Sequence, residues 1–435
     1  MQNSLVTGQN DKQENMDPLK LVEKEMKSCV KCGVCRAHCP VFSVLGREPA
    51  VARGKVALAR AIYSGAIEPD NRTYADMSRC LLCGNCVEKC PNDVPVDEIV
   101  VAARAALAKK RGLSSFHKAV RFLLKNRGIM RNGAFIAAIL SPFVLRKIPG
   151  SSGLRLRFPV PFIGRRRFFP KIAATPFMSR HPEITPGAAG KPRILFFAGC
   201  MTNYIYPQVG DAVLALLASL GCTVIIPKDQ QCCGLPAMSG GDMATFGELA
   251  TKNLDALERF QADYIVTSCA SCGGAIHSYY PAVIGKAFPE LADRCKAISS
   301  KAVDAVSLLK ILGFNAAKTT AEPGMKMAYH DPCHLRRQHK TKEPREFLRS
   351  LPGAEFVEME ASDACCGLGG TFNAYHYETS MAINSRKSAA ILKSGADIVL
   401  TACPGCMMQL NDGLLQKGSK TRVMHILEIM EQTIR

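Results

Sequence analysis

The sequence predicts a multidomain fold with an N-terminal all-α domain and two duplicated α/β domains that are rich in cysteine. Three observations predict it. Helical periodicity surrounds two cysteine motifs of identical spacing within residues 17–112. From Pro192 onward, short apolar strands alternate with helices, which is the pattern of α/β domains. The second half of that region repeats the first at an offset of 133 residues, which indicates an internal duplication.

The bulk composition is that of a soluble globular chain, and the start of the sequence leads us to expect that it is not exported. Hydrophobic residues make up 47% and charged residues 21% of the 435 residues, and both values are ordinary for a soluble protein with two or three cores. The first twenty residues contain no basic start and no apolar run, so no secretory signal is expected. The apolar stretch 133–145 is too short to span a bilayer and contains Pro142. We therefore expect a cytoplasmic protein whose dense, reduced cysteines indicate metal binding rather than disulfides.

The first predicted domain, residues 17–112, is helical. Apolar positions at helical spacing predict one helix within residues 51–65 and another over 95–112. Asp97 can cap the second of these helices, and Gly112 can stop it. The predicted boundaries along the chain are a disordered N-terminus (1–16), the helical domain (17–112), a basic linker (113–190), a first α/β domain (191–320) and a second α/β domain (321–435).

The basic linker holds the whole charge excess of the chain. The formal net charge is +19, and between Val101 and Arg193 there are 20 Lys and Arg residues but a single acid, Glu183. The remainder is balanced, with 36 bases and 36 acids. Beyond Ser151 the linker is rich in Pro, Phe and Arg, so irregular, extended chain is expected. Its earlier part has an apolar helical stripe, formed by Phe116, Ala119, Val120, Leu123 and Leu124.

The two α/β domains repeat both strands and cysteines. The pair Ala262-Asp263 precedes a strand that ends in cysteine, and Ala396-Asp397 precedes its counterpart. Several strands in each domain lead directly into a cysteine. The carboxyl ends of parallel strands meet at one edge of a sheet, which is the usual place for ligands. We therefore expect the cysteines of each domain to gather at that edge.

Two motifs of the spacing C-x2-C-x2-C-x3-C-P lie in the helical domain. A 4Fe–4S cube needs four thiolates, and in two-cluster bacterial ferredoxins the fourth cysteine of each motif binds the other cube. Zinc is the alternative, but eight thiols with a repeated proline fit zinc poorly. The expected ligands are a first ferredoxin set of Cys29, Cys32, Cys35 and Cys90, and a second ferredoxin set of Cys80, Cys83, Cys86 and Cys39.

Each α/β domain supplies five further thiols around a Cys-Cys-Gly sequence, and we call these domains the CCG domains. Soft sulfur ligands suit Fe–S clusters, Cu(I) or zinc, and the two ferredoxin motifs upstream favour Fe–S. The fifth thiol either completes a cluster of unusual shape or stays free beside an ordinary cube. The glycines, Gly234 and Gly367, allow backbone to approach a bulky cluster. The first CCG set is Cys200, Cys232, Cys233, Cys269 and Cys272, and the second is Cys333, Cys365, Cys366, Cys403 and Cys406.

These motifs resemble known families. The CCG domains, with flanking HDPCHLRR (330–337) and CCGLGGTF (365–372), resemble the cysteine-rich domains of the heterodisulfide reductase B subunit family. The order of two ferredoxin motifs, a linker and two CCG domains resembles the iron–sulfur subunit of glycolate oxidase. Lactate-utilisation and anaerobic glycerol-3-phosphate dehydrogenase subunits are similar. The resemblance covers residues 17–435, and the long basic linker departs from it.

The resemblance implies an electron-transfer subunit of a flavin-linked, membrane-associated dehydrogenase for a 2-hydroxy acid such as glycolate or D-lactate. It implies two 4Fe–4S clusters in the ferredoxin domain and one further 4Fe–4S cluster, non-cubane in the heterodisulfide reductase family, in each CCG domain. A partner subunit would bind FAD, because this chain has no flavin, nicotinamide or Walker motif. Electrons would pass to a membrane quinone or another carrier, and this chain alone would not oxidise substrate. The alternatives are disulfide reduction at a CCG cluster, or the role of the glycerol-3-phosphate dehydrogenase subunit.

The basic linker has three candidate partners. Phenylalanines interleave with its arginines, which favours an anionic membrane surface on the inner face of the cell membrane. An acidic face of a partner subunit is the second candidate. Nucleic acid is the third and is not expected, because no recognition module accompanies the charge. Two histidines, His330 and His334, flank Cys333, and hydrogen bonding is expected of them rather than metal ligation because five thiols already suffice.

Overall fold

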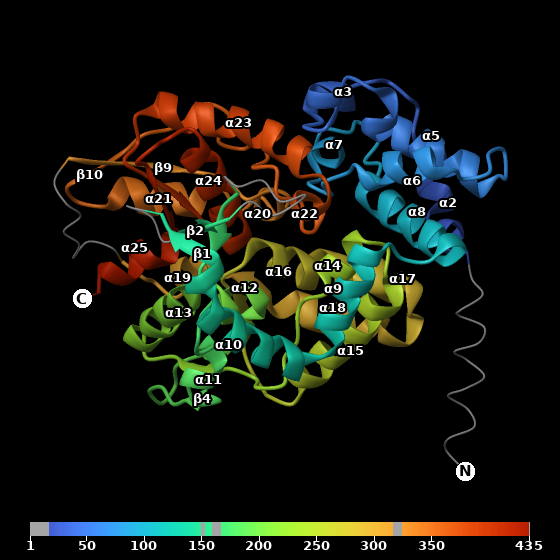
Figure 1. Ribbon diagram of the computed structural model, residues 1–435. Coiled ribbons are helices and arrows are strands. Elements are labelled where there is room, and N and C mark those ends of the chain that lie inside the picture. The colour runs from blue at the N-terminus through green and yellow to red at the C-terminus, as the bar shows by residue number, and fades with distance from the viewer. Residues whose placement is uncertain (1–16, 149–152, 159–166, 316–323, 435) are drawn as a thin grey trace, which may run out of the picture.

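The computed structural model describes residues 17–148, 153–158, 167–315 and 324–434. The predicted disordered segment, 1–16, lies outside the described residues. Three parts are visible in Figure 1: a helical lobe drawn in blue, the second CCG domain in orange and red beside it, and the first CCG domain in green and yellow beneath both. The N-terminal lobe therefore contacts both halves of the duplicated region.

The N-terminal lobe is all-helical, as predicted. Its helices are η1 (Pro18–Val22), α2 (Glu23–Lys27), α3 (Cys35–His38), α4 (Phe42–Leu45), η2 (Glu48–Ala50), α5 (Ala52–Tyr63), α6 (Asn71–Ser78), α7 (Asn85–Glu88) and α8 (Val96–Arg111). Asp17 caps the first helix by accepting a hydrogen bond from the Leu19 amide, and Gly112 ends α8 with φ of 80°. The expected cap at Asp97 is wrong, because α8 begins at Val96 and the Asp97 side chain is buried in a tertiary contact.

The linker has more regular structure than expected. Its helical stripe lies in α9 (Ser115–Lys125), where Leu124 is the buried member, and α10 (Arg127–Val144) follows. The expectation of irregular chain beyond Ser151 is wrong in part, because β2 (Gly153–Leu156) and β3 (Phe169–Pro170) lie there and form a small antiparallel sheet with the preceding strand β1 (Leu145–Lys147). The middle of the Pro- and Arg-rich stretch, 159–166, lies outside the described residues.

The first CCG domain is built on a sheet of order β4-β6-β5-β7-β8. The strands β5 to β8 pair in parallel, and β4 joins β6 antiparallel. Because β4 lies within the segment predicted as linker, the sheet begins earlier than residue 191. The strands are β4 (Ile184–Thr185), β5 (Arg193–Phe196), β6 (Thr223–Ile225), β7 (Tyr264–Thr267) and β8 (Ala302–Asp304). The helices are α11 (Phe177–Arg180), α12 (Gly199–Tyr204), α13 (Pro207–Ser219), α14 (Leu235–Ser239), α15 (Met243–Glu258), α16 (Ala270–Gly274), η3 (Ala275–Ile284), α17 (Gly285–Ala287), η4 (Pro289–Leu291), α18 (Ala292–Lys301) and α19 (Ala305–Ile311).

The second CCG domain repeats the parallel part of that sheet in the order β10-β9-β11-β12. The repeated Ala-Asp pairs hold the same position in both sheets. Asp263 accepts a hydrogen bond from the Arg193 amide, and Asp397 accepts one from the Lys326 amide. The strands are β9 (Met325–Tyr329), β10 (Ala354–Phe356), β11 (Ile398–Thr401) and β12 (Arg422–His425). The helices are α20 (Cys333–Arg336), α21 (Lys342–Ser350), α22 (Phe372–Tyr375), α23 (Tyr377–Ser394), α24 (Pro404–Gln416) and α25 (Ile426–Gln432).

The two CCG domains exchange packing surfaces. The last helix of the chain, α25, packs against α13 of the first domain, and α19 of the first domain packs against α21 of the second. Side chains of both domains form one continuous buried apolar core. The carboxyl ends of the two sheets, where the cysteines lie, are thereby held in a fixed relation.

Candidate metal centres

The two ferredoxin motifs fold into loops with the same unusual backbone. The residue before the second cysteine is left-handed in both, with φ of 58° at Lys31 and 54° at Leu82. The glycine after that cysteine is left-handed too, with φ of 91° at Gly33 and 71° at Gly84. A left-handed residue other than glycine is unfavourable and persists where its surroundings require it, commonly in ligand-binding loops. The repetition of this strain indicates two loops shaped to curl around a bound group.

The thiols of the first ferredoxin set lie around one small cavity near the surface. Its lining includes all four members and also Cys86 of the second set. Cys32 is exposed. The lining residues beyond the cysteines are mainly apolar, among them Val30, Val94 and Val96. The structure thus brings together the four residues expected for this set, and it places them beside the second set.

The second ferredoxin set is less accessible than the first, with Cys83 buried and Cys39, Cys80 and Cys86 partly buried. Burial raises the pKa of the Cys39 thiol to about 12, and the nearby thiols of Cys83 and Cys80 add to that rise. Burial also raises the pKa of Cys86, with contributions from Cys83, Cys80 and Cys39. The Cys39 side chain therefore lies among the thiols of the other motif, as the crossed ligand pattern requires.

Two buried cations that the sequence analysis did not identify surround this set. Arg104 donates hydrogen bonds to the carbonyls of Met77, Ser78 and Cys80 at 2.8–3.1 Å. Lys55 is 1% exposed and donates to the Asp76 carbonyl. Burial lowers the pKa of Lys55 to about 8 although the neighbouring Cys80 opposes that change. Buried positive charge at this point would offset the negative charge of metal-bound thiolates.

Both CCG sets lie at the carboxyl ends of parallel strands. In the first, the thiol of Cys232 lies 3.9 Å from that of Cys200, and hydrogen bonds with Cys232 and Cys272 lower the pKa of Cys233 to about 6. In the second, the Cys366 and Cys406 thiols lie 3.5 Å apart. Hydrogen bonds also join Cys269 to Cys272 in the first set, and Cys333 to Cys365, Cys365 to Cys366 and Cys403 to Cys406 in the second. Each domain therefore gathers the cysteines of its set.

An asparagine side chain holds the Cys-Cys-Gly turn in each domain, at the first cysteine in the first domain and at the second cysteine in the second. Asn253 donates to the Cys232 carbonyl, and Asn384 donates to the Cys366 carbonyl, each at 3.0 Å. The glycines of the two turns also have a conformational role that the sequence did not indicate. Gly234 and Gly367 have φ of 87° and 94°, and a side chain there would collide with the Phe246 ring or the Ser380 carbonyl. Each glycine thus allows a left-handed turn against a helix.

The four sets are joined by contacts between thiols of different domains. A hydrogen bond with Cys365 of the second CCG set lowers the pKa of Cys83 in the second ferredoxin set. A hydrogen bond with Cys269 of the first CCG set is the main cause that lowers the pKa of Cys403 in the second. Around the first of these junctions lies a separate apolar cluster that includes Val41, Leu81, Phe372 and Ile383. Thiols far apart in the sequence therefore form one continuous series.

A buried ion pair holds the N-terminal lobe on both CCG domains. Asp97 is 2% exposed, and its carboxylate accepts hydrogen bonds from Arg337 at 2.5 Å and from the Tyr279 hydroxyl at 2.9 Å. Arg337 belongs to the second CCG domain and Tyr279 to the first. This clasp lies beside the cysteine series, and only the fold could have revealed it.

The donors in these four sets fit iron–sulfur clusters. All twenty cysteines are free thiols, and eighteen belong to the sets. Soft sulfur donors in groups of four or five are the ligands that Fe–S clusters use. The two other cysteines, Cys222 and Cys295, are buried at 1% and 0% exposure in the first CCG domain, as is usual for small apolar side chains.

Two domain families match the chain where the sets lie. The 4Fe–4S dicluster domain matches residues 25–94, and the cysteine-rich domain matches residues 194–277 and 327–411. A probable glycolate oxidase iron–sulfur subunit of Bacillus subtilis (strain 168) is 32% identical, over 97% of this chain and 96% of its own length. The chain belongs to the family of glycolate oxidase iron–sulfur subunits.

Other members and relatives of the family also match over nearly the whole chain. The glycolate oxidase iron–sulfur subunit of Escherichia coli (strain K12) is 27% identical over 94% of each chain. A subunit of the anaerobic glycerol-3-phosphate dehydrogenase of the same organism is 25% identical, over 95% of this chain and 99% of its own. The predicted family is confirmed, and with it an iron–sulfur protein with an electron-transfer role in an oxidoreductase complex.

Proposed function

We propose that this chain is the electron-transfer subunit of a flavin-linked 2-hydroxy-acid dehydrogenase, with glycolate or D-lactate as substrate of the partner. The observation that supports this most strongly is the continuous series of thiols across three domains. The first and second ferredoxin sets and the first and second CCG sets would hold the clusters at the residues given above. Clusters bound there would accept and release single electrons. The chain's own residues would supply burial, positive charge and a fixed spacing between the sets.

The contacts between thiols support one order along the series. The first ferredoxin set adjoins the second through Cys86. The second ferredoxin set adjoins the second CCG set through Cys83 and Cys365, and the two CCG sets meet at Cys403 and Cys269. The first CCG set is the far end. We assign the flavoprotein to the ferredoxin end, where Cys32 is exposed.

The far end of the series lies beside the basic linker. A pocket there is lined by Cys200 and Cys232 of the first CCG set and by Arg127 and Met130 of α10. Helix α10 has no buried residue, and its exposed apolar side chains include Ile136, Leu140 and Phe143 at 51–71% exposure. Exposed apolar surface next to Arg and Lys is typical of helices that lie on an anionic bilayer. No helix among the described residues is long and apolar enough to cross a membrane, so we assign a peripheral association, with a membrane quinone as the acceptor.

The test is reconstitution with a flavoprotein subunit of a 2-hydroxy-acid dehydrogenase from the same organism. Purified anaerobically and alone, the chain should not reduce a dye at the expense of glycolate or D-lactate. With the flavoprotein, substrate should bleach the iron–sulfur absorbance of this chain. A variant with Cys83→Ala and Cys365→Ala should keep the flavoprotein's own activity but slow electron delivery to a quinone analogue. Oxidation of the hydroxy acid by this chain alone would contradict the proposal.

The second candidate is disulfide reduction at a CCG set, which both complete five-thiol sets favour. Its test is thiol release from small disulfides with a reduced dye as electron donor. Turnover that persists without any flavoprotein would favour this candidate over the first. Absence of thiol release from the reduced, iron-loaded protein would eliminate it.

A further inference from the structure

The two CCG domains differ at one buried position beside the cysteines. His330 and Phe197 follow equivalent strands, β9 and β5, and their amides make the same hydrogen bond across the sheet. The His330 amide donates to the Leu400 carbonyl at 2.8 Å, and the Phe197 amide donates to the Val266 carbonyl at 2.8 Å. The two side chains are 1% and 0% exposed. The same place in the duplicated fold thus holds an imidazole in the second domain and a phenyl ring in the first.

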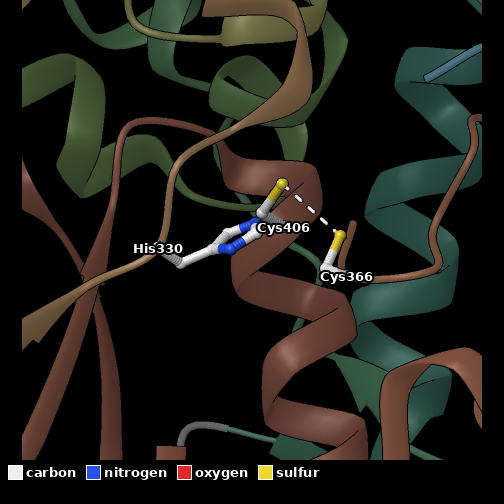
Figure 2. A group of neighbouring side chains, drawn as sticks. All are labelled: His330, Cys366 and Cys406. Carbon is white, nitrogen blue, oxygen red and sulfur yellow. Dashed lines mark hydrogen bonds between the residues drawn. The ribbon is translucent and has the colours of Figure 1, made fainter. Parts of the chain in front are cut away.

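The His330 imidazole points toward two thiols of the second CCG set (Figure 2). A ring nitrogen and the sulfurs of Cys366 and Cys406 all lie within 4.8 Å of one another. Among the described residues, neither ring nitrogen has a hydrogen-bond partner. The imidazole is nevertheless close enough to the Cys366 thiol for a weak interaction of the hydrogen-bond kind, which contributes, after Cys365 and Cys406, to the lowering of that thiol's pKa.

A buried imidazole without a partner is unfavourable, so its position requires an explanation. His425, by contrast, has a partner for each ring nitrogen, the Ser268 carbonyl at 2.9 Å and the Leu427 amide at 3.3 Å. His334 is intermediate, because it interacts with the Cys333 thiol while its Nε2 atom has no partner among the described residues. Phe197 shows that this site in the fold accepts an apolar ring without loss of the sheet. A packing role therefore does not account for a histidine here, whereas a ligand bound between the thiols does.

We propose that His330 is a nitrogen ligand to the cluster of the second CCG set, in place of the hydrogen-bonding role expected from the sequence, so that imidazole and thiolates hold this cluster together. The proposal rests on the proposed function only in placing an iron–sulfur cluster in that domain. The first CCG set offers no imidazole at the equivalent position and would bind through thiolates alone. Nitrogen and sulfur are both established ligands of iron in proteins.

The difference has an electrochemical consequence. A neutral imidazole places less negative charge on iron than a thiolate, and histidine ligation raises the reduction potential of iron–sulfur centres. The duplicated domains would therefore hold clusters of unequal potential, with the second CCG set the higher of the two. Because of this difference, an electron that arrives from the ferredoxin domain would reduce the cluster of the second CCG set before that of the first.

The first arm of the test is spectroscopic and uses the whole chain, purified anaerobically with 15N-labelled histidine. About 16 irons per chain are expected if all four sets are loaded. Pulsed EPR at each redox state should show a strongly coupled nitrogen in the wild type and none in His330→Phe. This variant places at position 330 the phenylalanine that the first CCG domain has at the equivalent position. His330→Gln is the second variant, and His277→Gln, at an exposed position, is the control that should keep the coupling.

The second arm is a redox titration followed by visible absorbance, which does not depend on an EPR signal. The reduction potential of one iron–sulfur cluster should be lower in both His330 variants than in the wild type, and it should be unchanged in His277→Gln. An unchanged set of potentials in the His330 variants, or a full iron content without strong nitrogen coupling, would overturn the ligand assignment alone. About 8 irons per chain in the wild type would overturn the cluster in the CCG domain as well.

Discussion

Single buried charges adjust the electrostatics of the cysteine series. Lys55 and Arg104 lie against the second ferredoxin set. In the second CCG domain, Lys387 is 2% exposed and lies beside Cys366. Burial lowers the pKa of Lys387 to about 8, and the nearby Cys366 thiol partly opposes this decrease. Each thiolate bound to a metal adds negative charge to a medium of low polarity, and these cations reduce that cost. The sequence did not indicate them, because a lysine in an amphipathic helix is ordinarily a surface residue.

The clasp between the lobe and the CCG domains gives the first prediction. Asp97→Asn removes the charge that Arg337 pairs with and should lower the free energy of unfolding by about 3 kcal/mol, the usual effect of breaking a buried pair. Urea titration followed by circular dichroism measures it. Asp293→Asn, at a fully exposed position, is the matched control and should change little. Equal midpoints for the two variants would contradict a structural role for the clasp.

His376 gives a prediction about pH. Burial lowers its pKa to about 4, helped by the charges of Arg79, Arg104 and Lys55, and its ring meets the Ser78 hydroxyl at 2.8 Å across the domain junction. The unfolded chain, with an ordinary histidine, binds more protons between pH 4 and 6.5, so stability should rise with pH across this window and fall as acid is added. In His376→Gln the thermal midpoint should depend less steeply on pH there. His339→Asn, an exposed position, should retain the wild-type slope, and an unaltered slope in His376→Gln would disprove this origin.

At the scale of the elements, helix α10 is notable because none of its residues is fully buried. Its apolar residues at positions 136, 140 and 143 lie at helical spacing and remain exposed. Lys and Arg flank it, and no acid lies between residues 101 and 182. This combination predicts binding to anionic lipid through both apolar contact and charge.

The prediction for α10 is a loss of vesicle binding. Phe143→Asp with Ile136→Asp should reduce co-sedimentation with vesicles containing phosphatidylserine at least tenfold, because each change places a charge where an apolar side chain would enter the lipid. Ile311→Asp, at an exposed position of the first CCG domain, is the control. Vesicles of neutral lipid should bind the wild type less well. Undiminished binding by the double variant would assign the contact to another surface.

The Cys-Cys-Gly turns give a matched pair of variants. Asn384 donates to the carbonyls of Cys366 and Gln409, so Asn384→Ala leaves buried carbonyls without a donor, at a cost of about 1–3 kcal/mol. We expect this variant to retain about four irons fewer than the wild type, and Asn253→Ala to show the same loss in the first domain. Iron assay with EPR measures both. Full iron content in both variants would show that the asparagines do not position the ligands.

Sequence reasoning succeeded where a local pattern determines the structure. The helices over 51–65 and 95–112 followed from apolar periodicity, and the repeated strands followed from duplication. It failed where the structure depends on distant partners. The clasp joins Asp97 to a residue 240 positions away, and this contact removed Asp97 from the capping role that its local position suggested. The short strands β1 to β3 are also invisible in the sequence, because three or four residues give too little alternation to detect.

For the molecule as a whole, helix α25 packs on α13 and α21 packs on α19, which joins the two CCG domains, and the two CCG sets meet where Cys269 interacts with Cys403. The N-terminal lobe then adds its two sets at one end of the series, through the apolar junction around Cys83 and Cys365. The candidate ligands were predictable from spacing alone. Their arrangement as one series was not, because it depends on how three domains pack.

The central claim is that the thiols of this series hold inorganic iron. The most direct measurement is iron and acid-labile sulfide per chain after strictly anaerobic purification, with EPR of the reduced protein. Four loaded sets predict about 16 irons and a brown protein with overlapping cluster signals. A well-folded, colourless protein that contains no iron and cannot be loaded with it would contradict the account.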